Sequence, residues 1–445
     1  MLVFCLLCAA APLWAAETSN YAYSLSSVEA LGFASRLLDS GHIGEAEKLY
    51  TQLLRSSHRE ISTEAAFKLG LIAMSKKDYN RAIELFIAIL NQQPNLARVR
   101  LELARLYFIL KNYDDARQHF ELVKGDQNLP PPVLEKVDAF LDLIRRQRNW
   151  STNFGFALVP DSNINQVSAA DEECIWTVFG LLCREREKKK SGVGAHANMS
   201  FDYYLKFNKN FGLRNSVGVD ITEYKQSQYD DYILHAATGP RYVFDSGEIS
   251  LQPTYQRRWV GHDKYSQSYG LRLDGQKDFK RVLAAGGLSY RRNVYDKDYI
   301  DDALRGDEYS AYVLGRYIVN PQSFVQARLR YIKDNTNMDM YGSDSTELGV
   351  GAYYIFKYGL SVFTELSMAE SRYHDSQYYI GKDYFIDETT REDKIYNLSV
   401  ELRTNILEHK GIRPVLRYGY TKRDSNIWSY EYDRHRLMGS IDYRF

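Results

Sequence analysis

The chain has 445 residues, and its 57 Lys and Arg are balanced by 57 Asp and Glu, so its formal net charge is zero. A neutral chain has no overall field that would attract nucleic acid or another polyanion. Charged residues make up 26% of the chain, and no run of about 18 apolar residues follows the N-terminal stretch, which argues against membrane-spanning helices.

Residues 1–16, MLVFCLLCAAAPLWAA, have the apolar core and small-residue end of a secretory signal. They carry no Lys or Arg near the start, which departs from the usual pattern. Removal of this segment would also remove Cys5 and Cys8, leaving Cys174 and Cys183. In an exported protein, an isolated cysteine pair is more often a disulfide than a metal site. We therefore predict a Cys174–Cys183 disulfide and no metal.

Residues 17–149 read as helical repeats. One set of positions recurs after a constant interval (103 − 69 = 34), which is the tetratricopeptide period. Pro130 to Pro132 break the array, and residues 133–145 predict a capping helix. Such an array offers a groove for a partner segment, although a spacer without a partner is the alternative. The repeated residues are Leu69, Gly70, Tyr79, Ala82 and Phe86, then Leu103, Ala104, Tyr113, Ala116 and Phe120, with a weaker copy at Ala34, Ile43, Ala46 and Tyr50.

From Trp150 to Phe445 the period changes to two. In residues 191–207, for example, apolar side chains alternate with mostly polar ones. Similar segments recur to the end of the chain and predict about fourteen strands. Short links such as 208–210 alternate with long polar links such as 163–190 and 373–392. Short turns on one side, long loops on the other and abundant Tyr and Phe are typical of an outer-membrane antiparallel β-barrel. The repeat domain would then lie in the periplasm.

The last strand supports the barrel. Leu437, Gly439, Ile441, Tyr443 and Phe445 share one face of an extended segment. A barrel needs its last strand to pair with its first, because closure removes both edges. Gly439, Ile441, Tyr443 and Phe445 also resemble the terminal signal that the barrel-assembly machinery reads. We therefore expect that machinery, periplasmic chaperones and outer-membrane lipid as partners. An ordinary terminal strand of a soluble sheet is the alternative.

The predicted first strand ends in a distinctive motif, Pro160-Asp161-Ser162-Asn163-Ile164-Asn165. A signal, a short repeat array, a proline break, a capping helix and a strand ending in this motif together resemble the surface lipoprotein assembly modulators, the barrel component of the type XI secretion system. The resemblance covers essentially the whole mature chain. It implies a fourteen-stranded outer-membrane translocon with Pro160, Asp161, Ser162, Asn163 and Asn165 as the family motif. Its cargo would be a surface lipoprotein or a released protein that captures haem or a metal.

Catalysis finds little support in the residues. Asp230-Asp231 and Asp301-Asp302 lie in predicted outer loops, as do His262 and His374, and outer-membrane proteases use Asp and His there. Acidic loops are, however, common on barrels. The chain has no Gly-x-Ser-x-Gly, His-Glu-x-x-His or phosphate-binding motif, so we predict neither an enzyme nor a cofactor. An outer-membrane hydrolase remains a minor alternative.

The predicted disulfide would enclose an apolar segment, residues 175–182, in the longest predicted outer loop. Closing a loop of about ten residues stabilises it by roughly 2–3 kcal/mol on the chain-entropy model. The disulfide could simply protect the loop, or it could hold a hydrophobic hairpin against the barrel mouth or the emerging cargo.

The polar faces of the strands mix both signs of charge, which argues against a pore for a strongly anionic polymer. The main alternative function, a polysaccharide export porin with tetratricopeptide repeats, usually needs a longer array and a charge-biased lumen. The charged residues on these faces include Arg214, Arg258, Arg272 and Arg316, with Asp202, Asp220 and Glu365.

Overall fold

The computed structural model describes residues 25–168, 172–185, 187–381, 385–405 and 412–444. The signal segment predicted for residues 1–16 lies outside these ranges. The chain divides between Lys77 and Asp78 into two units. None of the described helices is both long and apolar enough to cross a membrane.

The first unit holds three helices, and small residues let them pack closely. Ser26 caps the first helix, since its hydroxyl accepts from the Glu29 amide while the Glu29 carboxylate accepts from the Ser26 amide. Ala34, Ala46 and Tyr50 are fully buried, as the weaker repeat copy predicts. The helices are α1 (Ser27–Asp39), α2 (Ile43–Leu53) and α3 (Arg59–Ser75).

The helices of the second unit continue the repeat. Ala82, Phe86, Ala104, Ala116 and Phe120 are all fully buried, which agrees with their recurrence in the sequence. Small residues bring the helices together, and the aromatic rings fill the space between them. The helices are α4 (Tyr79–Gln92), α5 (Ala97–Ile109), α6 (Tyr113–Val123) and α7 (Pro131–Gln147).

Helix α7 begins where the proline run ends. Pro131 occupies its first turn, where a missing backbone N–H costs nothing. Val137, Leu141 and Ile144 are buried on one face, as predicted for the capping helix. The chain then enters the first strand at Trp150.

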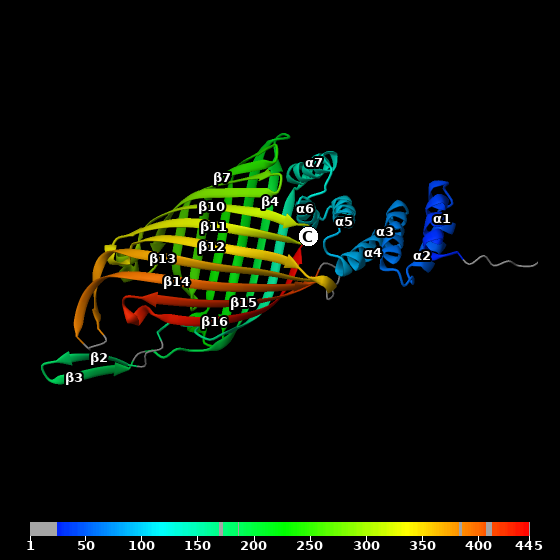
Figure 1. The fold of residues 1–445 in the computed structure, drawn as a ribbon. Helices are drawn as coiled ribbons and strands as arrows, with labels where there is room; N and C mark the ends of the chain where they lie inside the picture. Colours follow the sequence, from blue (N-terminus) through cyan, green and yellow to red (C-terminus); the bar gives the residue numbers. More distant parts are fainter. Residues whose placement is uncertain (1–24, 169–171, 186, 382–384, 406–411, 445) are drawn as a thin grey trace, which may run out of the picture. The chain divides into compact units, whose positions relative to one another are not determined.

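Fourteen antiparallel strands close into a barrel, and β1 completes it by pairing with both β4 and β16 (Figure 1). This confirms the predicted fold class of helical repeats followed by a fourteen-stranded barrel. The strands are β1 (Trp150–Asp161), β4 (Gly192–Lys206), β5 (Phe211–Tyr224), β6 (Asp231–Phe244), β7 (Gly247–Val260), β8 (Asp263–Phe279), β9 (Val282–Tyr295), β10 (Gly306–Asn320), β11 (Ser323–Thr336), β12 (Ser343–Ile355), β13 (Leu360–Ile380), β14 (Ile386–Thr404), β15 (Ile412–Ser425) and β16 (Tyr432–Arg444).

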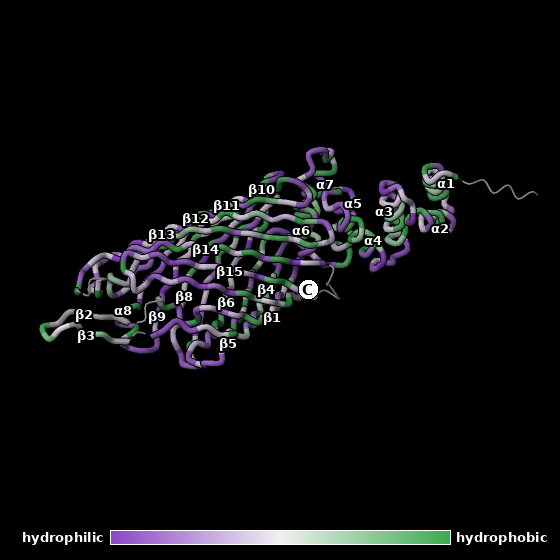
Figure 2. The backbone as a smooth tube through the Cα atoms, turned by 60° about the horizontal axis from the view of Figure 1, so that its bottom comes forward, coloured by the Kyte–Doolittle hydropathy of each residue, from purple (hydrophilic) through white to green (hydrophobic). Residues whose placement is uncertain are grey.

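Alternation along each strand separates an apolar outer face from a polar inner one. Phe154, Phe156 and Leu158 of β1 are exposed, while the residues between them are buried or half-buried. Figure 2 shows the same alternation as changes of colour along the strands. Tyr312 of β10 donates to the carboxylate of Asp274 on β8 at 3.1 Å, skipping a strand. Such a contact is favoured on the concave side, where the side chains of alternate strands converge, and it indicates that the polar face lines the lumen.

The long links contain more regular structure than the sequence predicts. A hairpin of β2 (Glu172–Thr177) and β3 (Gly180–Glu185) lies within the predicted link 163–190, and α8 (Asp298–Leu304) lies within another. Strands β13 and β14 extend into residues 373–392, with a register shift between Arg372 and Ser376. Polar cross-strand pairs such as Tyr379 and Asp387, joined at 3.0 Å, sustain the extension without an apolar pattern.

Candidate functional site

Helices α4–α7 lie at the end of the barrel that carries the short turns (Figure 1). On one side, α7 reaches three of them. Arg145 forms an ion pair with Asp278 near the end of β8. Arg146 donates to Asn210 Oδ1 at 2.5 Å and forms an ion pair with Asp245 at 3.1 Å. The last turn of α7 is therefore held by the links β4–β5, β6–β7 and β8–β9.

Two further hydrogen bonds join α7 to the same rim through backbone atoms. The carboxylate of Asp142 accepts from the amide of Ser246 at 3.0 Å. The guanidinium of Arg241, on the inner face of β6, donates to the carbonyl of Arg145 at 3.1 Å. Because this carbonyl lies at the C-terminal end of α7, the cation also interacts favourably with the helix dipole.

Helix α6 contacts the opposite side of the rim. Gln118 donates to the hydroxyl of Tyr353 on β12 at 3.3 Å, and Glu121 lies 3.7 Å from Arg316 on β10. Gly125, just after α6, lies directly against the backbone of Asn320, since a Cβ added there would be 2.5 Å from the Asn320 carbonyl carbon. No residue larger than glycine fits this position without a shift of backbone.

A buried ion pair joins α6 to β15. The carboxylate of Asp115 accepts two hydrogen bonds from the Arg413 guanidinium, at 2.7 and 2.5 Å. The side chain of Asp115 is only 7% exposed. Burial raises the pKa of Asp115, but the hydrogen bonds and charge of Arg413, helped by Asn112, outweigh it and hold that pKa below its usual range.

Helix α4 reaches the remaining turns. Asn405, at the end of β14, donates to Asn91 Oδ1 at 2.8 Å. Gly359, in the β12–β13 turn, adopts φ +71°, and a Cβ there would meet both Asn91 and Asn405. Among the described residues, α4–α7 thus contact every strand pair that is joined at this end: β4–β5, β6–β7, β8–β9, β10–β11, β12–β13 and β14–β15.

One face of α6 also looks into the lumen. A cavity of about 340 Å³ separates it from the inner wall of the barrel. Helix α6 therefore obstructs this end of the lumen. The cavity is lined by Asp114, Arg117 and Glu121 of α6, and by Arg316, Phe324 and Arg403 of the wall, among others.

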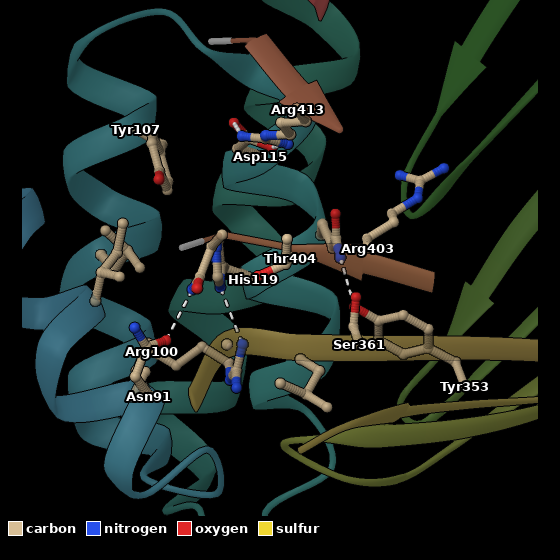
Figure 3. Close-up of a pocket in the computed structure, with 17 residues that line it drawn as sticks. Asn91, Arg100, Tyr107, Asp115, His119, Tyr353, Ser361, Arg403, Thr404 and Arg413 are labelled. Atoms are coloured by element: carbon tan, nitrogen blue, oxygen red, sulfur yellow. Dashed lines mark hydrogen bonds and ion pairs between the residues drawn. The ribbon is translucent and has the colours of Figure 1, made fainter. Parts of the chain in front are cut away.

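A second, smaller cavity of about 130 Å³ lies where α4, α5 and α6 meet the barrel rim (Figure 3). The guanidinium of Arg100 donates to Pro94 O at 2.5 Å and to His119 Nδ1 at 3.1 Å. The His119 ring stacks on Tyr107. Burial and the nearby Arg100 charge lower the pKa of His119 to about 3, so this histidine is neutral at physiological pH.

The lumen wall carries mixed charges, as the sequence predicts. Arg214 pairs with Asp202 at 3.1 Å. Arg328 reaches both Glu347, at 3.1 Å, and Glu365, at 3.0 Å. Most of these cations have a carboxylate beside them, so the wall is polar without one dominant sign.

At the other end of the barrel, the motif of the first strand joins β1 to β16. Asp161 is buried on the inner face, and its carboxylate accepts from Arg434 of β16 at 3.0 and 2.5 Å. Tyr224 of β5 donates to the same carboxylate at 3.4 Å. Ser162 accepts from the amide of His435 through its hydroxyl at 2.8 Å. Pro160 lies on the exposed outer face.

The two asparagines of the motif organise the loop that follows. Asn163 is fully buried, and its side-chain amide donates to Val167 O at 2.9 Å and to Asp433 O at 3.2 Å. Asn165 donates to Lys188 O at 2.9 Å and accepts from the Lys190 amide at 3.0 Å. The motif thus connects both closing strands and both ends of the longest loop. Its role as a functional site stays a prediction.

The predicted assembly signal lies on β16. Ile441 is 51% exposed on the outer face, and Gly439 and Tyr443 pair with Leu158 and Phe154 of β1. Phe445 lies outside the described residues. The terminal strand therefore closes the barrel, and its recognition by the assembly machinery stays a prediction.

The predicted disulfide lies in the β2–β3 hairpin. Cys174 and Cys183 are directly opposite each other in its ladder, and Cys183 is disulfide-bonded. The side chain of Cys174 is not among those that the structure describes, so its pairing with Cys183 stays a prediction. At the tip, Val178 and Phe179 are 95% and 98% exposed.

The acidic pairs that suggested a hydrolase make local contacts. Asp230 accepts from the Tyr224 amide at 2.7 Å. Asp231, the adjacent residue, forms a bidentate ion pair with Arg258 at 2.8 and 2.9 Å. Asp301 accepts from the Tyr295 amide at 2.8 Å, while Asp302 is exposed. Asp230, Asp231 and Asp301 therefore hold loop and strand ends.

His262 and His374 each lie beside a carboxylate. His262 is 3.7 Å from Asp230, and His374 is 3.7 Å from Asp344. The described residues contain no group of three or more metal-binding side chains.

Sequence reasoning missed the residues that join helices to barrel. Asp115 and Arg413 are 298 positions apart, and neither belongs to a motif. The one local signal was the basic end of the capping helix, Arg145-Arg146, followed closely by a strand. A basic last turn is common in helices, so it identifies no partner.

Comparison with known proteins places the chain in a family. A family model described as surface lipoprotein assembly modifier matches residues 150–445, and two tetratricopeptide models match residues 73–133 and 31–96. A surface lipoprotein assembly modifier of Pasteurella multocida is 22% identical, over 83% of this chain and 74% of its own length. Surface lipoprotein assembly modifier 1 of Neisseria meningitidis is 23% identical, over 86% and 76%. The hemophilin secretion modulator of Acinetobacter baumannii is 24% identical, over 85% and 78%. Since the family model covers more than half of it, the chain belongs to the surface lipoprotein assembly modifier family.

Proposed function

We propose that this chain is an outer-membrane translocon that delivers one cargo protein to the cell surface and hydrolyses nothing. Among the described residues, the contact of α4–α7 with every joined strand pair at one barrel end supports this proposal. Helical-repeat arrays commonly offer a groove to a partner segment, and this one would lie at the entrance of a polar lumen. A cargo held by the repeats would lie next to its route.

The lengths of the loops indicate which end of the barrel would face the periplasm. Long loops of membrane barrels face outward and short turns face the periplasm. On this orientation, α4–α7 lie in the periplasm, and the β2–β3 hairpin lies outside. Periplasmic chaperones would bring the unfolded cargo, and the barrel-assembly machinery would insert the barrel. Relatives named for surface lipoproteins and for hemophilin suggest a cargo that is either lipid-anchored or released.

Passage requires α6 to move, because it obstructs the lumen. The contacts that hold it are mostly polar, such as the Gln118–Tyr353 hydrogen bond at 3.3 Å and the Glu121–Arg316 pair at 3.7 Å. Polar contacts exchange readily with water or with a peptide, and moderately polar interfaces inside one chain commonly open. An arriving cargo segment could therefore replace them one by one.

Deletion of the chain from its own cell tests the function. Loss of one particular protein from the surface or medium, with its accumulation in the periplasm, would establish a dedicated protein translocon. Unchanged exported proteins with an altered capsule or matrix would refute it and favour the polysaccharide porin.

A reversible crosslink tests the moving helix. We would place Gln118→Cys and Tyr353→Cys in the native chain, whose Cys183 is disulfide-bonded, and join them with a short thiol linker that light cleaves. Export should stop on linking and resume on cleavage. The matched control is a chain with Glu102→Cys and Arg105→Cys. Both positions lie on α5, where a nitrogen of Arg105 and an oxygen of Glu102 are 2.9 Å apart, so a linker between them connects no helix to the barrel. Normal export by the Gln118–Tyr353 crosslinked protein would show that α6 stays in place.

A further inference from the structure

The cavity at the meeting of α4, α5, α6 and the barrel rim contains a buried cation, Arg100, that has no counter-ion among the described residues. Arg100 is 1% exposed, and its two hydrogen-bond acceptors, Pro94 O and His119 Nδ1, are both uncharged. Within the described part of the chain, no carboxylate forms an ion pair with it, and its Nε has no hydrogen-bond partner. Burial lowers the pKa of Arg100 only to about 10, so the guanidinium is charged at physiological pH.

The other groups of the cavity do not neutralise this charge. Asp115 is the only carboxylate among the described lining residues, and both its oxygens are taken by Arg413. Arg403 has its own partner outside the lining, Glu401, at 2.5 Å. Among the described lining residues, Arg100 is therefore the cation that has no carboxylate partner. An uncompensated buried charge is unfavourable, and native structures rarely keep one unless a ligand or a function requires it.

The hydrogen-bonding groups also fit an anion. Because Arg100 donates to His119 Nδ1, the neutral ring must carry its proton on Nε2. Among the described residues this second nitrogen has no hydrogen-bond partner, so it is a spare donor like Arg100 Nε. Figure 3 shows Arg100 and His119 side by side on the helices, facing Ser361 and Arg403 of the barrel. Two uncommitted donors, one of them charged, are what a carboxylate accepts from.

The cavity has room for a carboxylate. Its volume is about 130 Å³, and about 10–15 Å³ of such space holds one water, so a carboxylate fits together with several waters. One negative charge would balance Arg100, whereas a phosphate dianion would overcompensate it. The charge therefore favours a monovalent carboxylate.

We propose that this cavity binds one carboxylate group of an extended polypeptide, at the boundary between the helices and the barrel. The polypeptide source rests on the proposed function, since a protein exporter meets unfolded chains at this place. The carboxylate is either the C-terminus of the chain or an acidic side chain. Binding would occur between the helices and the rim that hold α6 in the barrel mouth.

Binding by the purified full-length protein in detergent tests this directly and does not depend on export. Four probes separate the possible sources: sodium acetate, an unstructured alanine-glycine peptide with a free C-terminus, the same peptide amidated, and the amidated peptide with one internal Glu. We expect the free-acid peptide or the Glu peptide to bind at least tenfold more tightly than the amidated peptide. Which of the two binds identifies the source of the carboxylate.

Two substitutions on the same helix provide the matched comparison. Arg100→Met should remove the preference for a carboxylate, while Arg98→Met, at an exposed position two residues away, should keep it. If Arg100→Met does not fold, the native protein and the four probes still decide. Equal binding of acid and amide peptides, binding of acetate only, or binding of none of the probes would each overturn the proposal. Export could still be normal in those cases, so the proposed function would stand or fall separately.

Discussion

The buried ion pair between α6 and β15 makes the closed state of the barrel testable. Asp115→Asn removes the charge of the carboxylate with almost no change of shape. Arg413 then loses the negative charge of Asp115, while Gln118, Glu121 and Arg145 still hold the helices on the rim. We expect α6 to stay folded but to leave the rim more often.

The structure sets the size of the effect. Removing one partner of a buried ion pair costs about 3–5 kcal/mol. The Arg413 side chain is 20% exposed, so water can partly solvate the remaining cation, and we take the lower end, about 3 kcal/mol. Since 1.36 kcal/mol corresponds to a tenfold change, the open fraction of α6 should rise on the order of 100-fold.

Trypsin cleavage at Lys124 measures the open fraction. The Lys124 side chain is 4% exposed and pairs with Asp138 at 2.7 Å, so trypsin reaches it only after opening. When opening is fast relative to cleavage, the cleavage rate follows the population of the open state. The cleavage rate at Lys124 should therefore rise on the order of 100-fold. As a control, a difference in gel migration between heated and unheated samples shows that the barrel itself stays folded.

Two variants complete this test. Asp39→Asn, at an exposed position of α1, removes the same charge and should leave cleavage unchanged. Exchanging the partners, with Asp115→Arg and Arg413→Asp, should restore much of the protection. If Asp115→Asn is cleaved at Lys124 no faster than the native chain, the ion pair does not hold α6, and the reasoning is wrong.

Three further predictions concern other parts of the chain. The pKa of His119 falls from 6.5 to about 3 on folding. The neutral ring therefore contributes fully to the free energy of unfolding above pH 6.5, and this contribution is lost as the pH falls toward 3. Between pH 6.5 and 5, the free energy of unfolding of α5 and α6 should fall by about 2 kcal/mol, and faster amide exchange in these helices would show it. Gly125→Ala would place a Cβ 2.5 Å from the Asn320 backbone and should also speed cleavage beside α6. Replacing Cys174 and Cys183 by Ser should leave barrel assembly intact but reduce cargo display.

Each of these has its own contradicting result. His119→Gln has no imidazole to protonate and should remove the loss below pH 6.5; an equal loss in this variant would assign the effect to another group. Gly44→Ala on α2, where a Cβ meets nothing within 4 Å, is the control for the glycine change, and cleavage of Gly125→Ala no faster than that of this control would contradict the prediction. Unchanged display after the double Cys→Ser change would show that the hairpin only protects its loop.

The barrel was predictable because each strand carries its own signal. A residue two positions away shares the same face, so Phe154, Phe156 and Leu158 indicate the outer face without any knowledge of their neighbours in space. Small residues at a constant interval marked the close helix contacts in the same local way, as at Ala82 and Ala116. Both signals repeat many times, and repetition distinguishes them from chance.

The joining of helices to barrel was not predictable, because its signals do not repeat. Asp115 looks like an acidic first-turn residue of any helix, and Arg413 looks like a polar residue near a strand start. Only the folded chain brings them together. Helix α8 was missed for a related reason, since a segment of seven residues is too short to show a period.

The structure gives a second physical reason why the turns at one end of the barrel are short. In the sequence, their length indicates only the side of the membrane that they face. In the structure, Gly359 and Asn405 lie under α4, and Asn320 lies directly against Gly125 after α6. A longer turn at any of these places would push the helices away from the rim and remove the contacts beside it. The asymmetry of the loops therefore also reflects the need to seat α4–α7 on one end of the barrel.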